Sequence, residues 1–210
     1  MLKLCIAIYM IVVFFLIKRM KHRSRLFEIF TSSLFILTFI CNTIFAIYTL
    51  GWHGLLTHEL PLYHCSFGMM AQMYFFFFNK ESNIYLKHAN VIALGGAVSA
   101  IFFSGLITSN YLLYSVLVYS HLIYYTNALY CIFVRDIRMH YYEYYPCIVS
   151  LAGYDILIFT VNAIFNTNYS FVYSSPLGLS LHPLFTLLAN FILFLGFYLF
   201  DYVFICRKER

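Results

Sequence analysis

Charged side chains are scarce along this chain of 210 residues. They make up 10% of the sequence, whereas soluble domains carry about 25%. Apolar residues account for 63%, and the mean hydropathy is +0.82. A soluble core cannot hide this much apolar surface. The composition therefore excludes an ordinary soluble domain and predicts an all-α polytopic membrane protein.

Closely paired cysteines, of the kind that secreted or zinc-binding domains use, are lacking as well. The six cysteines, at positions 5, 41, 65, 131, 147 and 206, lie within or at the ends of apolar runs and form no Cys-x-x-Cys pair. This argues against a secreted disulfide framework. The net charge of +5 does not indicate nucleic-acid binding, because the basic residues lie beside apolar runs and serve anchoring and orientation.

The first apolar run, Leu4–Ile17, is expected to be a retained membrane span. The basic segment Lys18–Arg25 follows it, whereas a signal peptide carries its positive charge before the apolar run. A cleavage site of small residues is also missing from this part of the sequence.

Seven apolar runs predict a single bundle of seven transmembrane helices over residues 1–210. We place them at 2–19, 28–50, 61–79, 88–108, 111–134, 144–165 and 183–206. Most of them reach the roughly 20 residues that a helix needs to cross about 30 Å of hydrocarbon. With the N-terminus outside and the C-terminus cytoplasmic, only Lys3 of the 13 Lys and Arg residues lies outside, as the positive-inside rule favours. The expected location is the cell membrane, with multiple passes.

Polar side chains recur at helical spacing on five predicted spans, which predicts a polar interior to the bundle. The stripes are Thr31, Thr38, Asn42 and Thr49; Cys65, Gly68, Gln72 and Asn79; Tyr114, His121 and Tyr125; Asp155, Asn162 and Asn166; and Thr186, Asn190 and Asp201. Interhelical hydrogen bonds explain most of the Asn, Thr and Ser residues. The span at 88–108 instead repeats Gly96, Ala100 and Ser104, a spacing that predicts close helix packing.

Asp155 and His121 need a stronger explanation than packing. An aspartate at mid-span costs roughly 2.5–3.5 kcal/mol on insertion and should have a partner or a wet cavity. Counting about 1.5 Å per residue from the outer ends places both side chains near mid-membrane. We therefore expect a hydrogen bond between His121 and Asp155. The same count puts His121 about 9 Å deeper than Cys65.

The segment His58–Ser66, with the sequence HELPLYHCS, gathers two histidines, a carboxylate and a thiol. It does not match the zinc motif HExxH, because its histidines are six residues apart with Pro61 between them. Four outer histidines are available for a shared metal: His53, His58, His64 and His182. Interfacial histidines are more often simply solvated, so neither a metal nor another cofactor is expected.

Pro61 is expected to be the first helical residue of the third span. Cys65 would then lie one turn into the helix, where the positive end of the helix dipole favours a thiolate. His64 points about 100° away from Cys65 and is a poor base for it. Cys65 alone is open to two readings: a small buried apolar residue or a nucleophile.

Two segments and one histidine resemble a known family. Leu60–Cys65 (LPLYHC), the mid-span His121, and Asn166–Val172 (NTNYSFV) resemble the YwaF family of small bacterial integral membrane proteins. The resemblance covers about residues 28–205. That family is related to a eukaryotic transmembrane protein that acylates ether phospholipids with a cysteine and a histidine. The resemblance implies Cys65 as nucleophile and His121 as base.

The first functional hypothesis is a lipid acyltransferase or lipid hydrolase, with membrane lipids as partners and a phospholipid acyl chain as substrate. Cys65 would accept the acyl group, and His121, oriented by Asp155, would act as base and then as acid. The residues expected to bind substrate are Tyr63, His64, Gln72, Asn162, Asn168 and Tyr169.

Two alternatives stay open. One is a binding or transport bundle that passes a small solute or lipid, with Asp155 and His121 as a proton-linked pair. The other is an assembly subunit whose aromatic surface, drawn from 20 Tyr and 24 Phe residues, packs against another membrane protein.

Overall fold

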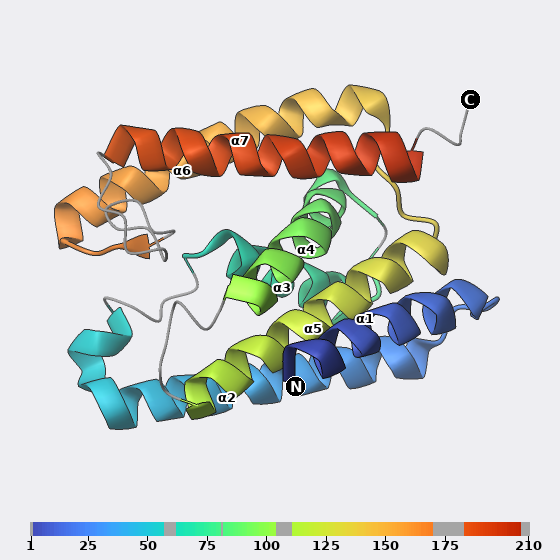
Figure 1. Ribbon diagram of the computed structural model, residues 1–210, viewed down its shortest axis with the longest axis horizontal. Coiled ribbons are helices and arrows are strands. Elements are labelled where there is room, and N and C mark those ends of the chain that lie inside the picture. Colours follow the sequence, from blue (N-terminus) through green and yellow to red (C-terminus); the bar gives the residue numbers. More distant parts are fainter. Residues whose placement is uncertain (1, 57–61, 81, 104–110, 170–182, 207–210) are drawn as a thin grey trace.

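A computed structural model describes residues 2–56, 62–80, 82–103, 111–169 and 183–206, and these contain seven α-helices and no strand (Figure 1). The helices are α1 (Leu2–Arg19), α2 (Arg25–Gly54), α3 (His64–Phe77), α4 (Ile84–Phe103), α5 (Tyr111–Phe133), α6 (Tyr144–Phe165) and α7 (Pro183–Asp201). A 3₁₀ turn, η3 (Tyr141–Glu143), precedes α6, and a π-helical turn, η5 (Tyr202–Cys206), extends α7. The predicted all-α class is confirmed.

Three helices in the described residues are long and apolar enough to cross a membrane. They are Arg25–Gly54, Ser115–Phe133 and Tyr141–Phe165, the last of which includes η3. The chain is therefore a membrane protein with transmembrane helices. The predicted number of spans and their orientation stay predictions.

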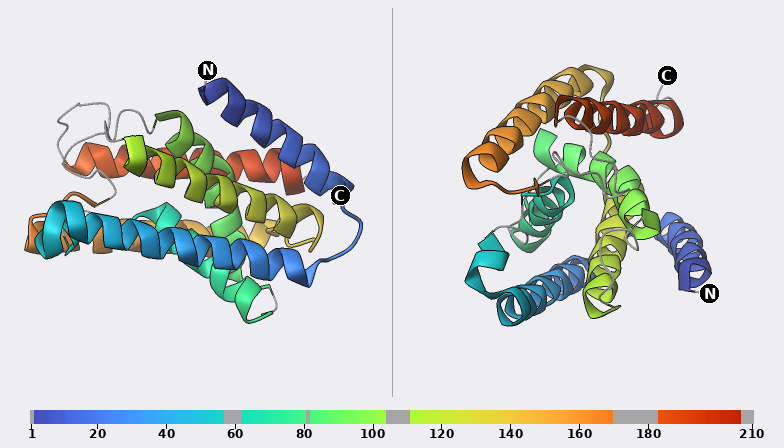
Figure 2. Two further views of the ribbon diagram at one scale, coloured as in Figure 1. Left: turned by 90° about the horizontal axis from the view of Figure 1, so that it is seen from below. Right: turned by 60° about the vertical axis from the view of Figure 1, so that its left-hand side comes forward.

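α4 lies at the centre of the bundle, where it contacts α3, α5 and α7. α1 packs against α5, α2 packs against α3 and α5, and α6 packs against α7. The right-hand view of Figure 2 shows the pair α6–α7 on one side and α1, α2 and α5 on the other. The largest core cluster joins α3, α4 and α5 to α6 and α7. Buried polar side chains occur on every described helix from α2 to α7.

α2 begins earlier than predicted and does not present its threonines as expected. Ser24 caps its N-terminus, because the Ser24 hydroxyl accepts from the Phe27 amide at 3.3 Å. Thr31, Thr38 and Thr49 each donate to the carbonyl four residues earlier in the same helix. The predicted stripe faces the interior in part, since Thr31 is buried, Thr38 is half-buried and Thr49 is exposed. The hydroxyls bond within α2 rather than across to another helix.

α3 is shorter than the predicted span 61–79. Tyr63 has an extended backbone (φ −88°, ψ 145°), so the helix begins at His64. Pro61, predicted as the first helical residue, lies outside the described residues. After Phe77 the chain leaves the helix, and Asn79 has a positive φ of 52°. Cys65 is thus the second residue of α3 rather than one full turn inside it.

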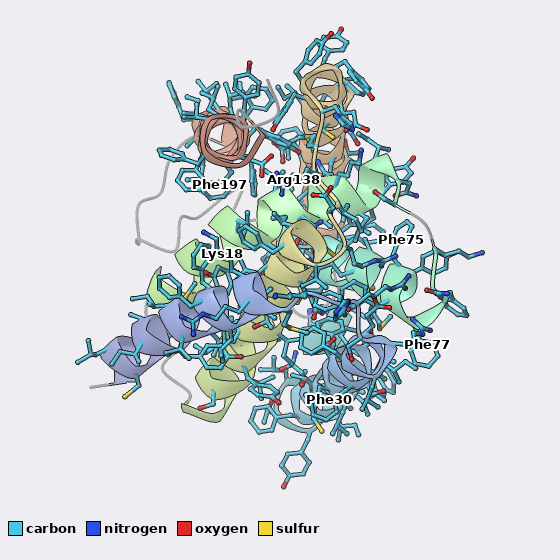
Figure 3. All side chains as sticks on the ribbon, turned by 90° about the vertical axis from the view of Figure 1, so that its right-hand side faces the viewer. Lys18, Phe30, Phe75, Phe77, Arg138 and Phe197 are labelled. Atoms are coloured by element: carbon cyan, nitrogen blue, oxygen red, sulfur yellow. The ribbon has the colours of Figure 1, made fainter. Side chains whose placement is uncertain are left out.

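The close packing predicted for α4 occurs one residue away from the expected repeat. A Cβ atom added at Gly95 would overlap the ring of Phe197 on α7, whereas one at Gly96 would meet only Ile92 of its own helix. Figure 3 labels Phe197 on the side of α7 that faces α4. The side chain of Ala100 and all of Ser104 lie outside the described part of the chain.

A buried carboxylate ties the start of α2 to the ends of α3 and α5. Glu28 is fully buried, and its two oxygens accept from Arg23 Nε and Nη2 at 2.8 and 2.9 Å. Arg25 Nη1 donates to it at 3.1 Å, and Arg135 Nε lies 3.8 Å away. Arg25 also donates to the last carbonyls of α3. The hydrogen bonds with Glu28 raise the pKa of Arg23 above its ordinary value.

Candidate functional site

Two contacts set the register between α3 and α5. A Cβ atom at Gly68 would overlap the hydroxyl of Tyr124, and further along both helices the ring of Phe76 meets that of Tyr130 at 5.9 Å. The later residue of α3 therefore meets the later residue of α5, so the two helices run parallel. Cys65 and His121 both precede the first contact by three residues and lie within about one helical turn of the same level. The predicted difference in membrane depth between them stays a prediction.

His121 on α5 is held in one tautomer. Its side chain is buried, and Nδ1 lies 2.7 Å from the carbonyl oxygen of Leu117. Because a carbonyl only accepts, Nδ1 carries the proton and Nε2 keeps a lone pair. Nε2 is buried and has no hydrogen-bond partner among the described residues. The predicted hydrogen bond between His121 and Asp155 is therefore wrong, and a backbone carbonyl orients this imidazole instead.

Asp155 on α6 pairs with His64, the residue next to Cys65. The distance from His64 Nε2 to Asp155 Oδ1 is 3.1 Å, and both side chains are more than nine-tenths buried. Tyr154 and Phe194 contact the imidazole ring at centroid distances of 4.6 and 4.5 Å. The two groups lie at ion-pair distance, but the contact does not have hydrogen-bond geometry, and both Asp155 oxygens lack a hydrogen bond within the described residues. Because His64 belongs to the first turn of α3, Asp155 lies in the same layer as Cys65.

The thiol of Cys65 lies at the N-terminal end of α3. The residue is half-buried and packs against the core cluster that includes Tyr124. Its place in the first helical turn puts the sulfur near unpaired backbone amides and the positive end of the helix dipole. Cys131, in the last turn of α5, and Cys147, in the first turn of α6, are buried.

Asn162, predicted to bind substrate, instead closes the turn that follows α6. Its Oδ1 accepts from Thr167 Oγ1 at 2.7 Å and from the Tyr169 amide at 2.8 Å, while its Nδ2 donates to the Tyr169 carbonyl at 2.9 Å. Asn166 ends the helix in a left-handed conformation with φ 51°. Both polar atoms of Asn162 are thus engaged within the protein.

The end of α6 is also tied to the start of α3. The hydroxyl of Tyr169 donates to the Leu56 carbonyl at 2.6 Å, and its ring meets that of Tyr63 at 5.6 Å. The hydroxyl of Tyr154 donates to the Leu62 carbonyl at 2.8 Å. The structure therefore brings the predicted residues Tyr63, His64, Asp155 and Tyr169 together.

The other two predicted substrate residues are Gln72 on α3 and Asn168 in the turn after α6. Gln72 is two turns further along α3, where its Nε2 donates to Asn90 Oδ1 at 3.1 Å. This contact makes it a packing residue between α3 and α4. Asn168 is half-buried in the turn after α6.

A cavity of about 230 Å³ between α3, α4 and α6 was not foreseen. His64, His88, Cys147 and Ser150 are among its lining residues. His88 Nδ1 hydrogen-bonds the hydroxyl of Tyr198 on α7. The sequence predicts only close packing for α4. His88, at the start of the span predicted at 88–108, is the residue that could have indicated a polar cavity there. Among the described residues, no group of three or more His, Cys, Asp or Glu side chains is placed to hold a metal ion.

Comparison with known proteins identifies the family. No curated protein and no solved structure matches the chain. The TMEM164 family, by contrast, matches residues 1–201, which is nearly the whole sequence. The chain therefore belongs to the TMEM164 family, a family of transmembrane proteins.

Proposed function

We propose that this protein is a membrane lipid acyltransferase or lipid hydrolase in which Cys65 carries the acyl group and His121 moves the protons. The proposal includes the seven-span topology with the N-terminus outside. The resemblance of LPLYHC and NTNYSFV to the YwaF family supports it. So does membership of a transmembrane family.

The observation that carries the proposal is the state of His121. A buried imidazole whose Nδ1 proton is held by the Leu117 carbonyl presents Nε2 as a base. That nitrogen has no hydrogen-bond partner among the described residues and lies in the same layer of the bundle as the Cys65 thiol. A carbonyl that orients the base replaces the carboxylate that usually has this role.

The chemistry proceeds in two balanced steps. His121 Nε2 takes the proton of the Cys65 thiol, and the thiolate attacks the ester carbonyl of a lipid. The leaving alkoxide takes the proton back from His121, which leaves a thioester on Cys65. A second hydroxyl, from a lysolipid or from water, then gives its proton to His121, attacks the thioester and releases the thiolate. The identity of that hydroxyl decides between transfer and hydrolysis.

His64 and Asp155 are assigned to substrate binding in this scheme. His64 on α3 faces Asp155 on α6, so this pair joins the two helices beside Cys65. Together with Tyr63 and Tyr169, they would position the polar part of a lipid at the start of α3.

An acyl-chain activity probe tests the proposal. It should label the wild type but not Cys65→Ala, and His121→Gln should lower the labelling rate by about 10²-fold or more, as loss of a general base does. Cys147→Ala is the matched control, since it removes another thiol that lies outside the proposed pair. Equal labelling of the wild type and Cys65→Ala would exclude Cys65 as nucleophile.

The pair His64–Asp155 beside the cavity also favours a second candidate function, proton-linked transport of a small solute or lipid. In that case flux into proteoliposomes should depend on Asp155 and survive Cys65→Ala. The reverse pattern favours the enzyme.

A further inference from the structure

Five basic residues are concentrated where α1 ends and the chain turns into α2. They are Lys18, Arg19, Lys21, Arg23 and Arg25. The structure separates them into two sets. Arg23 and Arg25 turn inward and bind the buried Glu28, so their charges are used within the protein. Lys18, Arg19 and Lys21 point to the exterior, and we call them the outer basic cluster.

The outer basic cluster has no counter-charge among the residues that the structure describes. All three side chains are exposed, and none lies within ion-pair distance of a carboxylate in the described part of the protein. The one specific contact is Lys18 Nζ over the ring of Phe14 at 5.8 Å, which steers the stem of the lysine along α1. Figure 3, which looks onto this end of the bundle, labels Lys18 beside α1.

The residues just before the cluster place it at the surface of a lipid layer. Phe15 and Leu16, in the last turns of α1, are 55% and 58% exposed. Large apolar side chains that face outward and are followed directly by cations mark the boundary between hydrocarbon and head groups. With α1 as a membrane span, as in the proposed topology, the cations would lie at the depth of lipid phosphates.

The turn that holds the cluster is fixed to the bundle. The hydroxyl of Tyr130 on α5 accepts from the Ser24 amide at 2.7 Å and lies 3.2 Å from the Ser24 carbonyl. Glu28 holds the neighbouring Arg23 from the other side. The backbone is thus already ordered, so a ligand would have to order only three side chains.

We propose that the outer basic cluster is a binding site for the head groups of anionic phospholipids in the leaflet at this end of the bundle. Clusters of Lys and Arg directly beside a membrane helix attract anionic lipid, with a gain of about fivefold per cation. The Arg19 guanidinium can bind a phosphate through two parallel hydrogen bonds, while the two lysines supply point charges. A zwitterionic lipid offers no net charge to this site.

Native mass spectrometry of the detergent-purified full chain tests this proposal. With dioleoylphosphatidylglycerol, the wild type should retain more lipid than with dioleoylphosphatidylcholine. The triple variant Lys18→Gln, Arg19→Gln, Lys21→Gln should lose that preference, with an apparent affinity lower by about tenfold to a hundredfold. Lys18→Arg with Lys21→Arg keeps the charge and should behave as the wild type. Raising the salt concentration should weaken the preference.

Three results would overturn it. The first is an unchanged preference for phosphatidylglycerol in the triple variant. The second is equal retention of both lipids by the wild type. The third is displacement of the lipid by millimolar glycerol phosphate, because the site would then bind a soluble phosphate rather than a membrane surface. The three side chains have no ion-pair partner in the described protein, so the triple variant should fold, and its circular dichroism checks this.

Discussion

Glu28→Gln should be among the most destabilising single changes at this end of the protein. The substitution keeps the size of the side chain but removes the charge that two arginines contact at 2.8 to 3.1 Å and that Arg135 approaches at 3.8 Å. Breaking a buried ion pair by removing one partner costs about 3–5 kcal/mol. Arg23 and Arg25 are 42% and 39% exposed, so water screens part of the interaction and the lower end of that range applies.

A loss of about 3 kcal/mol lowers the melting temperature of a protein of this size by about 6–12 °C. Thermal unfolding of the detergent-solubilised chain, followed by circular dichroism, measures the shift. Asp136→Asn is the matched control, since it removes a carboxylate that is 80% exposed and pairs only with Arg138 among the described residues. It should change stability by less than about 1 kcal/mol. Equal shifts in melting temperature for the two variants would show that the ion pairs of Glu28 do not stabilise the protein more than an exposed pair does.

Two further predictions concern the layer around the proposed site. Gly68→Ala should destabilise the protein by about 1–3 kcal/mol, because the added Cβ atom would overlap the buried Tyr124 hydroxyl. Gly153→Ala is its control, since the added Cβ atom would have open space around it, and it should be neutral or stabilising in the same melting assay. A double-mutant cycle of His64→Gln and Asp155→Asn should show a coupling of at least about 1 kcal/mol in the free energy of unfolding; strictly additive effects would contradict the pairing.

The helices were largely predictable, because each apolar run of about 20 residues has one stable form in lipid. The spans 2–19 and 144–165 coincide with α1 and α6. The start of α3 was not predictable from local preferences. Tyr63 has an extended backbone, and the Tyr169 ring packs against its side chain. The neighbouring Leu62 carbonyl accepts a hydrogen bond from the Tyr154 hydroxyl on α6. Both contacts come from residues about a hundred positions later in the chain.

Counting residues along a helix predicts the depth of Asp155 but not which neighbouring helix its side chain faces. The count predicts His121 as the partner of Asp155 because both are counted to the same depth, whereas the structure pairs Asp155 with His64, the neighbour of Cys65. Which histidine meets the carboxylate depends on which neighbouring helix α6 faces, and that follows from packing across the whole bundle. The proposed roles of Cys65 and His121, by contrast, rest on the resemblance and on neither helix geometry nor packing.

The shortness of α3 bears on the bilayer around it. Its 14 residues span about 21 Å, against a hydrocarbon core of about 30 Å. Phe67, Tyr74, Phe77 and Phe78 are 40% to 62% exposed, so this flank of the bundle faces the surroundings. Under the proposed seven-span topology, lipid next to α3 would compress or tilt to match, at a cost of a fraction of a kcal/mol per Å. Thin membranes should therefore suit the protein better than thick ones, and lipids that accept local thinning should gather beside the helix that carries Cys65.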